Sequence, residues 1–219
     1  MSQSGEFIVI GLGRFGRSVV LNLTRQGRSV LAVDLDPERV EMVKEDVDAA
    51  VIADTTDEQA LAELPLERMT CAVVTIGARA TEASILTTAL LRQLGVPRVV
   101  VRSFNDLHAR VLLAVGASEV LNPEDEMGRR LALHLSNPAI GEQIQLGDAS
   151  ITEVETPEAF VGRSLAELDL RNRLDITVLA LRRGDRVRAN PRSSEQVESG
   201  DVLVLMGSAA AVRRVAALE

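Results

Sequence analysis

The chain has 219 residues, of which 46% are hydrophobic and 26% charged, a composition typical of globular proteins and a length above the usual single domain. Its 24 basic and 32 acidic residues give a formal net charge of -8, and 2% of the residues are aromatic. Both the basic groove and the stacking surface typical of nucleic-acid-binding proteins are therefore missing. We expect two globular domains and no nucleic-acid partner.

The start of the chain and its apolar runs indicate a cytoplasmic protein. The first six residues include no basic residue, and no run of 18 uncharged apolar residues occurs. These features predict neither a signal peptide nor a helix that spans a bilayer. The single cysteine, Cys71, lies in an apolar run and is expected to be a buried strand residue.

The first half of the chain alternates short β-branched runs with longer helical patterns, the sequence form of repeated βαβ units. Asp36 precedes Pro37 at a helix start, and Gly27 and Gly95 follow helix ends. The alternation predicts an α/β fold over residues 1–123, a Rossmann-like, doubly wound parallel sheet. The expected strands are 7–10, 30–34, 50–53, 72–76, 98–102 and 119–121.

The alternation stops near residue 123, where a helical pattern over 124–135 begins. Met127, Leu131 and Leu135 recur at four-residue spacing and form an apolar stripe. The stripe packs either on the chain's own sheet or on a partner, and its own domain is favoured because amphipathic helices usually bury their apolar face locally. We expect residues 124–149 to link two domains as a helix and hinge.

Residues 150–219 follow a different pattern, with short strands and capped helices. Ser164 with Glu167 three residues later is a capping box, and Ser208 is placed to cap a final helix. The pattern predicts a small α+β domain that leans on another copy or on the first domain, because so short a segment buries little core. The expected strands are 151–155, 176–181, 186–188 and 202–206.

A candidate phosphate-binding loop, GLGRFG, occupies residues 11–16 between an expected strand and an expected helix. Gly11 permits the tight turn, Gly13 lets the backbone approach a pyrophosphate, and Gly16 allows close packing of helix on strand. Arg14 would lie in the first turn of the helix, where a cation is unfavourable unless an anion is bound beside it. We therefore expect Arg14 to contact phosphate, with a solvated surface arginine as the alternative.

An acidic residue in the expected position accompanies the loop. Asp34 ends the second strand, 18 residues after Gly16, where such folds place the carboxylate that accepts hydrogen bonds from ribose hydroxyls. A carboxylate there repels a 2'-phosphate, which disfavours NADP and leaves NAD, ATP, ADP and AMP open. The alternative is a degenerate domain that keeps its glycines for packing and binds nothing.

The side chains that catalyse hydride transfer are missing. That reaction needs a proton-transfer group, usually His, Lys or Tyr, close to the nicotinamide. The chain has no tyrosine, and His108 and His134 fall in helical segments. One cysteine and two distant histidines offer no zinc-site spacing. We therefore expect a protein that is not an enzyme, with a small NAD-dependent oxidoreductase or an NADH redox sensor as the alternative.

The order of the motifs resembles the cytosolic Trk/Ktr-type potassium-uptake regulatory subunits, in which an RCK (KTN) domain precedes a TrkA-C domain. The resemblance implies a protein that binds ATP or ADP, with NAD(H) as a further ligand, and that gates a membrane potassium-translocating subunit. It also implies a homodimer that closes into an octameric ring and sits at the inner face of the cell membrane through its partner. The motifs are residues 11–16, Asp34, Ala53-Asp54, Ile76-Gly77-Ala78, Asn122-Pro123-Glu124 and Met127-Gly128.

The resemblance also assigns roles to individual residues. Arg14 corresponds to an arginine that reaches the phosphates, and Asp34 and Asp36 to ribose-binding positions. Asp54 stands where some relatives have Asn. The complete set implied for the nucleotide is Gly11, Gly13, Arg14, Phe15, Gly16, Asp34, Asp36, Asp54, Thr55, Ile76, Gly77 and Arg102.

Two further sites are implied by the same resemblance. Glu124 corresponds to an acidic residue associated with a divalent or monovalent cation at the terminal phosphate. The TrkA-C domain of some relatives binds cyclic di-AMP between two copies. Arg171 and Pro191 fall near the matching stretch, so they are the candidates for that second-messenger site.

Overall fold

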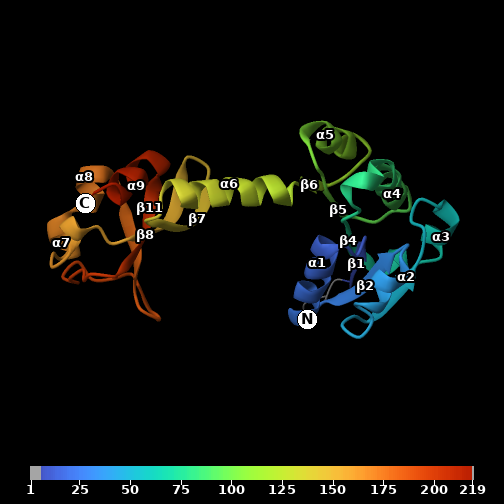
Figure 1. The fold of residues 1–219 in the computed structure, drawn as a ribbon, viewed down its shortest axis with the longest axis horizontal. Coiled ribbons are helices and arrows are strands. Elements are labelled where there is room, and N and C mark those ends of the chain that lie inside the picture. The colour runs from blue at the N-terminus through green and yellow to red at the C-terminus, as the bar shows by residue number, and fades with distance from the viewer. Residues whose placement is uncertain (1–5, 219) are drawn as a thin grey trace. The chain divides into compact units, whose positions relative to one another are not determined.

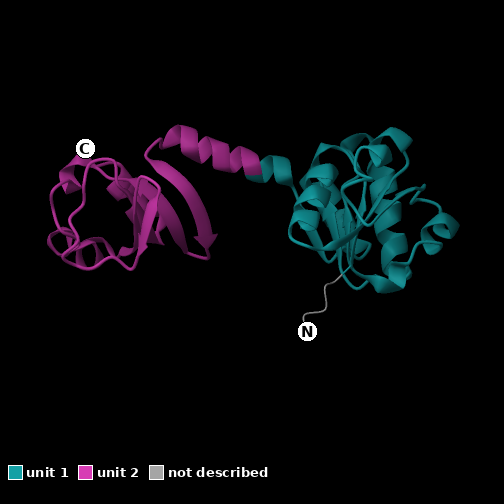
Figure 2. Ribbon diagram, turned by 90° about the horizontal axis from the view of Figure 1, so that it is seen from below, with its two compact units in different colours: residues 1–126 teal, residues 127–219 magenta. Residues whose placement is uncertain are grey.

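The structure, a computed structural model, describes residues 6–218. The chain divides into two compact units, residues 1–126 and 127–219, and the division falls inside helix α6 (Pro123–Ser136) (Figure 2). Within 6–218, none of the helices has the length and apolar character needed to cross a membrane.

The first unit contains a six-stranded sheet in which every paired strand is parallel (Figure 1). The strand order is β3-β2-β1-β4-β5-β6. β2 and β3 are therefore added on one side of β1, and β4, β5 and β6 on the other side, so the strand order reverses between β1 and β4. This is the doubly wound, Rossmann-like order, and it confirms the predicted fold class. The strands are β1 (Glu6–Ile10), β2 (Ser29–Asp34), β3 (Ala49–Ile52), β4 (Met69–Val74), β5 (Val99–Arg102) and β6 (Glu119–Leu121).

Helices cover both faces of this sheet, because successive strand residues enter two different cores. Val9 packs in one core with residues of α1 and α2, whereas Ile8 and Ile10 pack in the other with residues of α3, α4 and α5. Cys71 is buried in β4, as predicted. The helices are α1 (Arg14–Arg25), α2 (Pro37–Glu41), α3 (Glu58–Ala62), α4 (Thr81–Gln93) and α5 (Asp106–Ala114), with short 3-10 turns η1 (Leu66–Arg68) and η2 (Ala78–Ala80).

The predicted helix boundaries of the first unit are confirmed by the capping geometry. The Asp36 side chain accepts a hydrogen bond from the Glu38 N–H at 2.9 Å, with Pro37 as the first residue of α2. Gly27 and Gly95 follow the ends of α1 and α4 with φ angles of +71° and +87°. Glycine adopts this left-handed conformation without the steric cost that other residues have.

The second unit is a five-stranded antiparallel sheet of order β10-β9-β11-β8-β7, packed against short helices, and it confirms the predicted small α+β domain. The Ser164–Glu167 capping box begins α7, and the Ser208 hydroxyl accepts a hydrogen bond from the Ala211 N–H in α9, as predicted. The elements are β7 (Ile140–Leu146), β8 (Ala149–Glu155), η3 (Glu158–Phe160), α7 (Leu165–Leu168), α8 (Leu170–Leu174), β9 (Thr177–Arg183), β10 (Arg186–Ala189), β11 (Val202–Ser208) and α9 (Ala209–Ala216).

Two features of the linking segment differ from the predictions. Residues 140–146 form β7, an edge strand, where a hinge was expected; Gly141 and an irregular register with β8 interrupt its alternation. The stripe of Met127, Leu131 and Leu135 is 59%, 54% and 70% exposed. The favoured interpretation, that this stripe packs on its own domain, is therefore wrong for the single chain.

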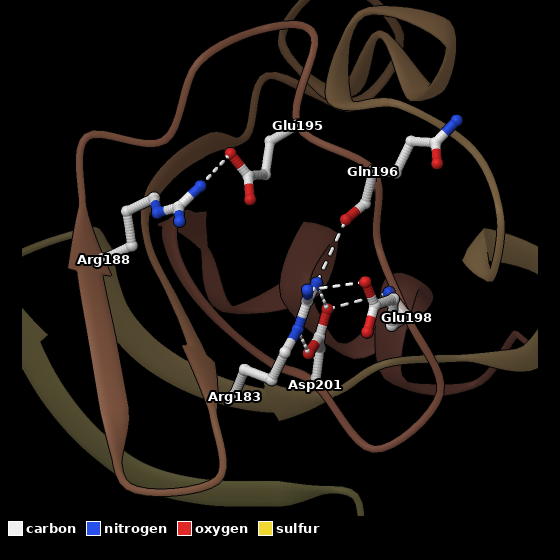
Figure 3. A network of polar contacts seen from close by, with 6 residues as sticks. All are labelled: Arg183, Arg188, Glu195, Gln196, Glu198 and Asp201. Carbon is white, nitrogen blue, oxygen red and sulfur yellow. Dashed lines mark hydrogen bonds and ion pairs between the residues drawn. The ribbon is translucent and has the colours of Figure 1, made fainter.

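A polar network fixes the segment between β10 and β11 (Figure 3). Arg183 donates hydrogen bonds to both carboxylate oxygens of Asp201, at 2.8 and 2.9 Å, and one to Glu198 at 2.6 Å. The Glu198 N–H also donates to Asp201, at 2.8 Å. The side-chain hydrogen bonds from Arg183 are the largest cause that holds the pKa of the buried Asp201 below its ordinary value. Arg188 pairs with Glu195 in the same segment.

Candidate functional site

A cavity of about 830 Å³ lies at the carboxyl ends of the parallel strands of the first unit. It is centred on the point where the strand order reverses, between β1 and β4, which is where open α/β sheets bind their ligands. The predicted nucleotide residues that line it are Gly11, Gly13, Asp34, Asp36, Asp54, Thr55, Ile76, Gly77 and Arg102.

The three glycines of the phosphate loop occupy three different environments. Gly11 has a φ of +92°, and a Cβ there would lie 2.9 Å from the backbone nitrogen of Ile76. A Cβ at Gly16 would overlap the carbonyl oxygen of Gly11 and the hydroxyl of Thr75. A Cβ at Gly13 would meet no atom within 4 Å. Gly11 and Gly16 are thus required by the fold, whereas Gly13 opens onto the cavity.

The N-terminus of α1 carries free backbone donors. Its N-cap is Gly13, which has no side chain to accept a hydrogen bond from the first-turn N–H groups. Such an end favours an anion through its N–H groups and the helix dipole. Arg14 is the first residue of the helix and is exposed; Arg14, Phe15 and Gly16 lie beside the cavity rather than in its lining.

The end of β2 supplies a carboxylate that the protein itself positions. Asp34 is 7% exposed and accepts hydrogen bonds from the N–H groups of Leu12 at 2.5 Å and Asp36 at 2.9 Å. Arg39 also lines the cavity, with its Nη1 3.5 Å from Oδ2 of Asp34 and its Nε 3.3 Å from Oδ2 of Asp36. Asp34 is therefore rigidly held next to the phosphate loop, with Arg39 balancing part of its charge.

The loop after β3 contributes a further negative charge, that of Asp54. The Asp54 carboxylate accepts hydrogen bonds from the Thr56 hydroxyl at 2.7 Å and the Thr56 N–H at 3.0 Å, and these bonds lower the pKa of Asp54. Asp54 therefore stays ionised at neutral pH. Thr55 also lines the cavity, but its buried hydroxyl is bonded to the Thr87 hydroxyl at 2.8 Å, which ties this loop to α4.

The cavity wall opposite Asp34 is basic. Arg102, the last residue of β5, forms an ion pair with Glu124 in the first turn of α6. Its guanidinium carbon lies 5.7 Å from the ring centroid of Phe15 and 5.2 Å from that of Phe104. Glu124, which was predicted to hold a cation, is thus in contact with a cationic side chain.

Neither of the two histidines lines the cavity. His108 is buried in α5 and stacks on Phe104, and neither of its ring nitrogens has a hydrogen-bond partner among residues 6–218. Burial lowers the pKa of His108, so its ring is neutral. His134 lies in α6, with Nδ1 3.3 Å from the carbonyl oxygen of Ile140. In the described part of the chain, no group of three or more His, Cys, Asp or Glu residues is arranged to hold a metal.

Two charged residues of the cavity lining, Arg39 and Arg79, were not predicted from the sequence. Arg39 is three residues beyond Asp36, and the spacing of an acid and a base at i and i+3 in a short helix is the signal that points to their pairing. Arg79 in η2 lines the cavity, and no acidic partner for it occurs within 6–218. The predicted second-messenger residues lie elsewhere, Arg171 on α8 and Pro191 just after β10.

Comparison with known proteins places this architecture in a family. The model of the TrkA-N domain matches residues 7–123, and the model of the TrkA-C domain matches residues 151–219. The chain belongs to the TrkA-N/TrkA-C family. The cavity lies in the TrkA-N domain, whereas the network of Figure 3 lies in the TrkA-C domain.

Its relatives in this family include potassium-uptake proteins. Ktr system potassium uptake proteins C and A of Bacillus subtilis (strain 168) are each 35% identical over 210 residues, which cover 95% of this chain and 95% and 94% of theirs. Among solved structures, the GsuK channel bound to NAD superposes with a TM-score of 0.70 at 18% identity, over 98% of this chain and 40% of that one. That likeness shows that the TrkA-N/TrkA-C fold is shared.

Proposed function

We propose that this TrkA-N/TrkA-C protein is a cytoplasmic, nucleotide-binding regulatory subunit of a potassium-uptake system and not an enzyme. The observation that carries the proposal is the juxtaposition of the uncapped α1 N-terminus and the anchored Asp34 at the cavity between β1 and β4. The potassium-uptake relatives supply the process in which such a site would act.

The preferred ligand of the site is ATP or ADP, with NAD(H) as the alternative. The ribose hydroxyls are proposed to bind at Asp34 and Asp36, and the phosphates at the N–H groups of the first turn of α1. The terminal phosphate is assigned to Arg14, and a divalent or monovalent cation beside it to Glu124. The GsuK structure bound to NAD supports NAD(H) as a ligand that this fold accommodates.

The protein is proposed to act as a homodimer within an octameric ring at the inner face of the membrane, where it controls a potassium-translocating subunit. The exposed apolar stripe of Met127, Leu131 and Leu135 supports a contact between copies, because such a stripe is costly to leave in water. Cyclic di-AMP is proposed as a second ligand of the TrkA-C domain, with Arg171 and Pro191 at its site.

Gating needs a ligand that binds the two states of the ring with different affinity. If Arg14 contacts the terminal phosphate of ATP, the Arg14→Ala variant is expected to lose the discrimination between ATP and ADP. Its affinity for ADP is expected to stay within about threefold of that of the wild type, because the charge of Arg14 is exposed. Isothermal titration calorimetry with both nucleotides measures this. Arg17→Ala, an exposed arginine one turn further along α1, is the control. Equal losses for ATP and ADP in Arg14→Ala would contradict the assignment.

A further inference from the structure

Arg102 is a cation held in a fixed position on the cavity wall. Its guanidinium lies against the rings of Phe15 and Phe104, at distances typical of favourable cation–π contacts. Phe104 stacks in turn on the buried His108, with ring centroids 5.2 Å apart and planes inclined by 9°. The Arg102 side chain is only 19% exposed. These contacts hold the guanidinium at the cavity wall.

The acidic partner of this cation is held much less firmly. Glu124 lies in the first turn of α6 and its side chain is 61% exposed. The Nε of Arg102 is buried and has no hydrogen-bond partner among the described residues. An arginine side chain has five N–H donors, so the protein leaves part of the donor capacity of Arg102 unused.

We propose that Glu124 is an internal competitor of the nucleotide for Arg102, an inference that rests on the proposed function. Carboxylate and phosphate both match the planar donor geometry of a guanidinium, and a phosphate group brings more negative charge. A phosphate bound at the cavity therefore displaces the Glu124 carboxylate from Arg102. Nucleotide binding in the cavity then changes the contacts of the first turn of α6, the helix that continues into the second unit.

The charge of Glu124 is therefore expected to oppose nucleotide binding when no cation is present. In EDTA, Glu124→Gln is expected to raise the affinity for ADP about fivefold, the effect of one partly exposed ion pair. Arg102→Ala is expected to lower the affinity, and adding Glu124→Gln to it is expected to change nothing further, because the contested guanidinium is gone. Calorimetry on the full chain measures all four proteins, and Glu126→Gln removes the same charge from the same turn of α6 as a control.

Competition for Arg102 predicts an effect that is specific to Glu124 and that requires Arg102, whereas simple charge repulsion predicts neither. Unchanged or weaker ADP binding by Glu124→Gln in EDTA would overturn the inference, and so would an equal gain in Glu126→Gln or in the Arg102→Ala background. These outcomes leave the proposed function intact, since the wild-type chain would still bind ADP. A wild-type chain that binds no adenine nucleotide would overturn both.

Discussion

Replacement of Gly16 by alanine is expected to lower the free energy of unfolding of the first unit by about 3 kcal/mol. The added Cβ would overlap the Gly11 carbonyl oxygen and the Thr75 hydroxyl, and both atoms belong to a buried hydrogen bond that joins β4 to the phosphate loop. Neither neighbour is the far end of a flexible side chain, so backbone must move. Urea unfolding, monitored by hydrogen exchange on peptides from each unit, measures the loss of stability and shows in which unit it occurs.

The control for this change is Gly13→Ala, which adds the same methyl group at another glycine of the same loop. Gly13 has a φ of -64°, which any residue adopts, and a Cβ there meets no atom within 4 Å. Its stability is expected to stay within about 1 kcal/mol of wild type. Equal destabilisation by the two replacements would show that Gly16 is not the packing glycine of the loop.

Loss of the Asp201 carboxylate is expected to lower the free energy of unfolding of the second unit by about 2 kcal/mol. Asp201→Ala removes a buried acceptor and leaves the Glu198 N–H and two donors of Arg183 without their partner. Glu198→Gln is the matched control, because Glu198 binds the same arginine but is 61% exposed. That variant is expected to lose less than about 1 kcal/mol. Chemical denaturation, monitored by hydrogen exchange in the second unit, compares the stability of the two variants with that of the wild type.

The effect of Asp201 depends on pH in a defined direction. Hydrogen bonds from Arg183 lower the pKa of Asp201 in the folded state. Its contribution to stability is therefore present above the unfolded carboxyl pKa of about 3.9 and is lost as the pH falls through the lower folded pKa. The difference between wild type and Asp201→Ala should shrink over that acidic range. A difference that stays constant down to acid would contradict the network's role, as would equal losses in the Asp201 and Glu198 variants at neutral pH.

The parts of the fold and site that local patterns encode were predictable from the sequence. The glycine loop, Asp34 at the end of β2 and the caps at Asp36, Ser164 and Ser208 each depend on residues close together in the chain. Short-range spacing determines these features, so one sequence displays them. The same holds for the alternation of strands and helices that identifies the doubly wound sheet.

Features that depend on tertiary contacts were not predictable in this way. Arg102 and Glu124 are 22 residues apart and meet because β5 ends beside the start of α6. Arg79 reaches the cavity because the loop after β4 lies against the loop after β1. The stripe that includes Leu131 has helical periodicity whichever surface covers it, so periodicity alone does not say whether that surface is the same chain or another copy.

Calorimetric titration of the full chain with ATP, ADP and NADH tests most directly whether the cavity beside Gly13 is the site of a nucleotide switch. We expect saturable binding of ATP or ADP, weakened at least about tenfold by Gly13→Val, whose side chain occupies the space that the phosphates need. We also expect that NADH is not consumed when carbonyl substrates are added. Absence of saturable binding by a folded wild-type chain, or turnover of NADH, would contradict this proposal.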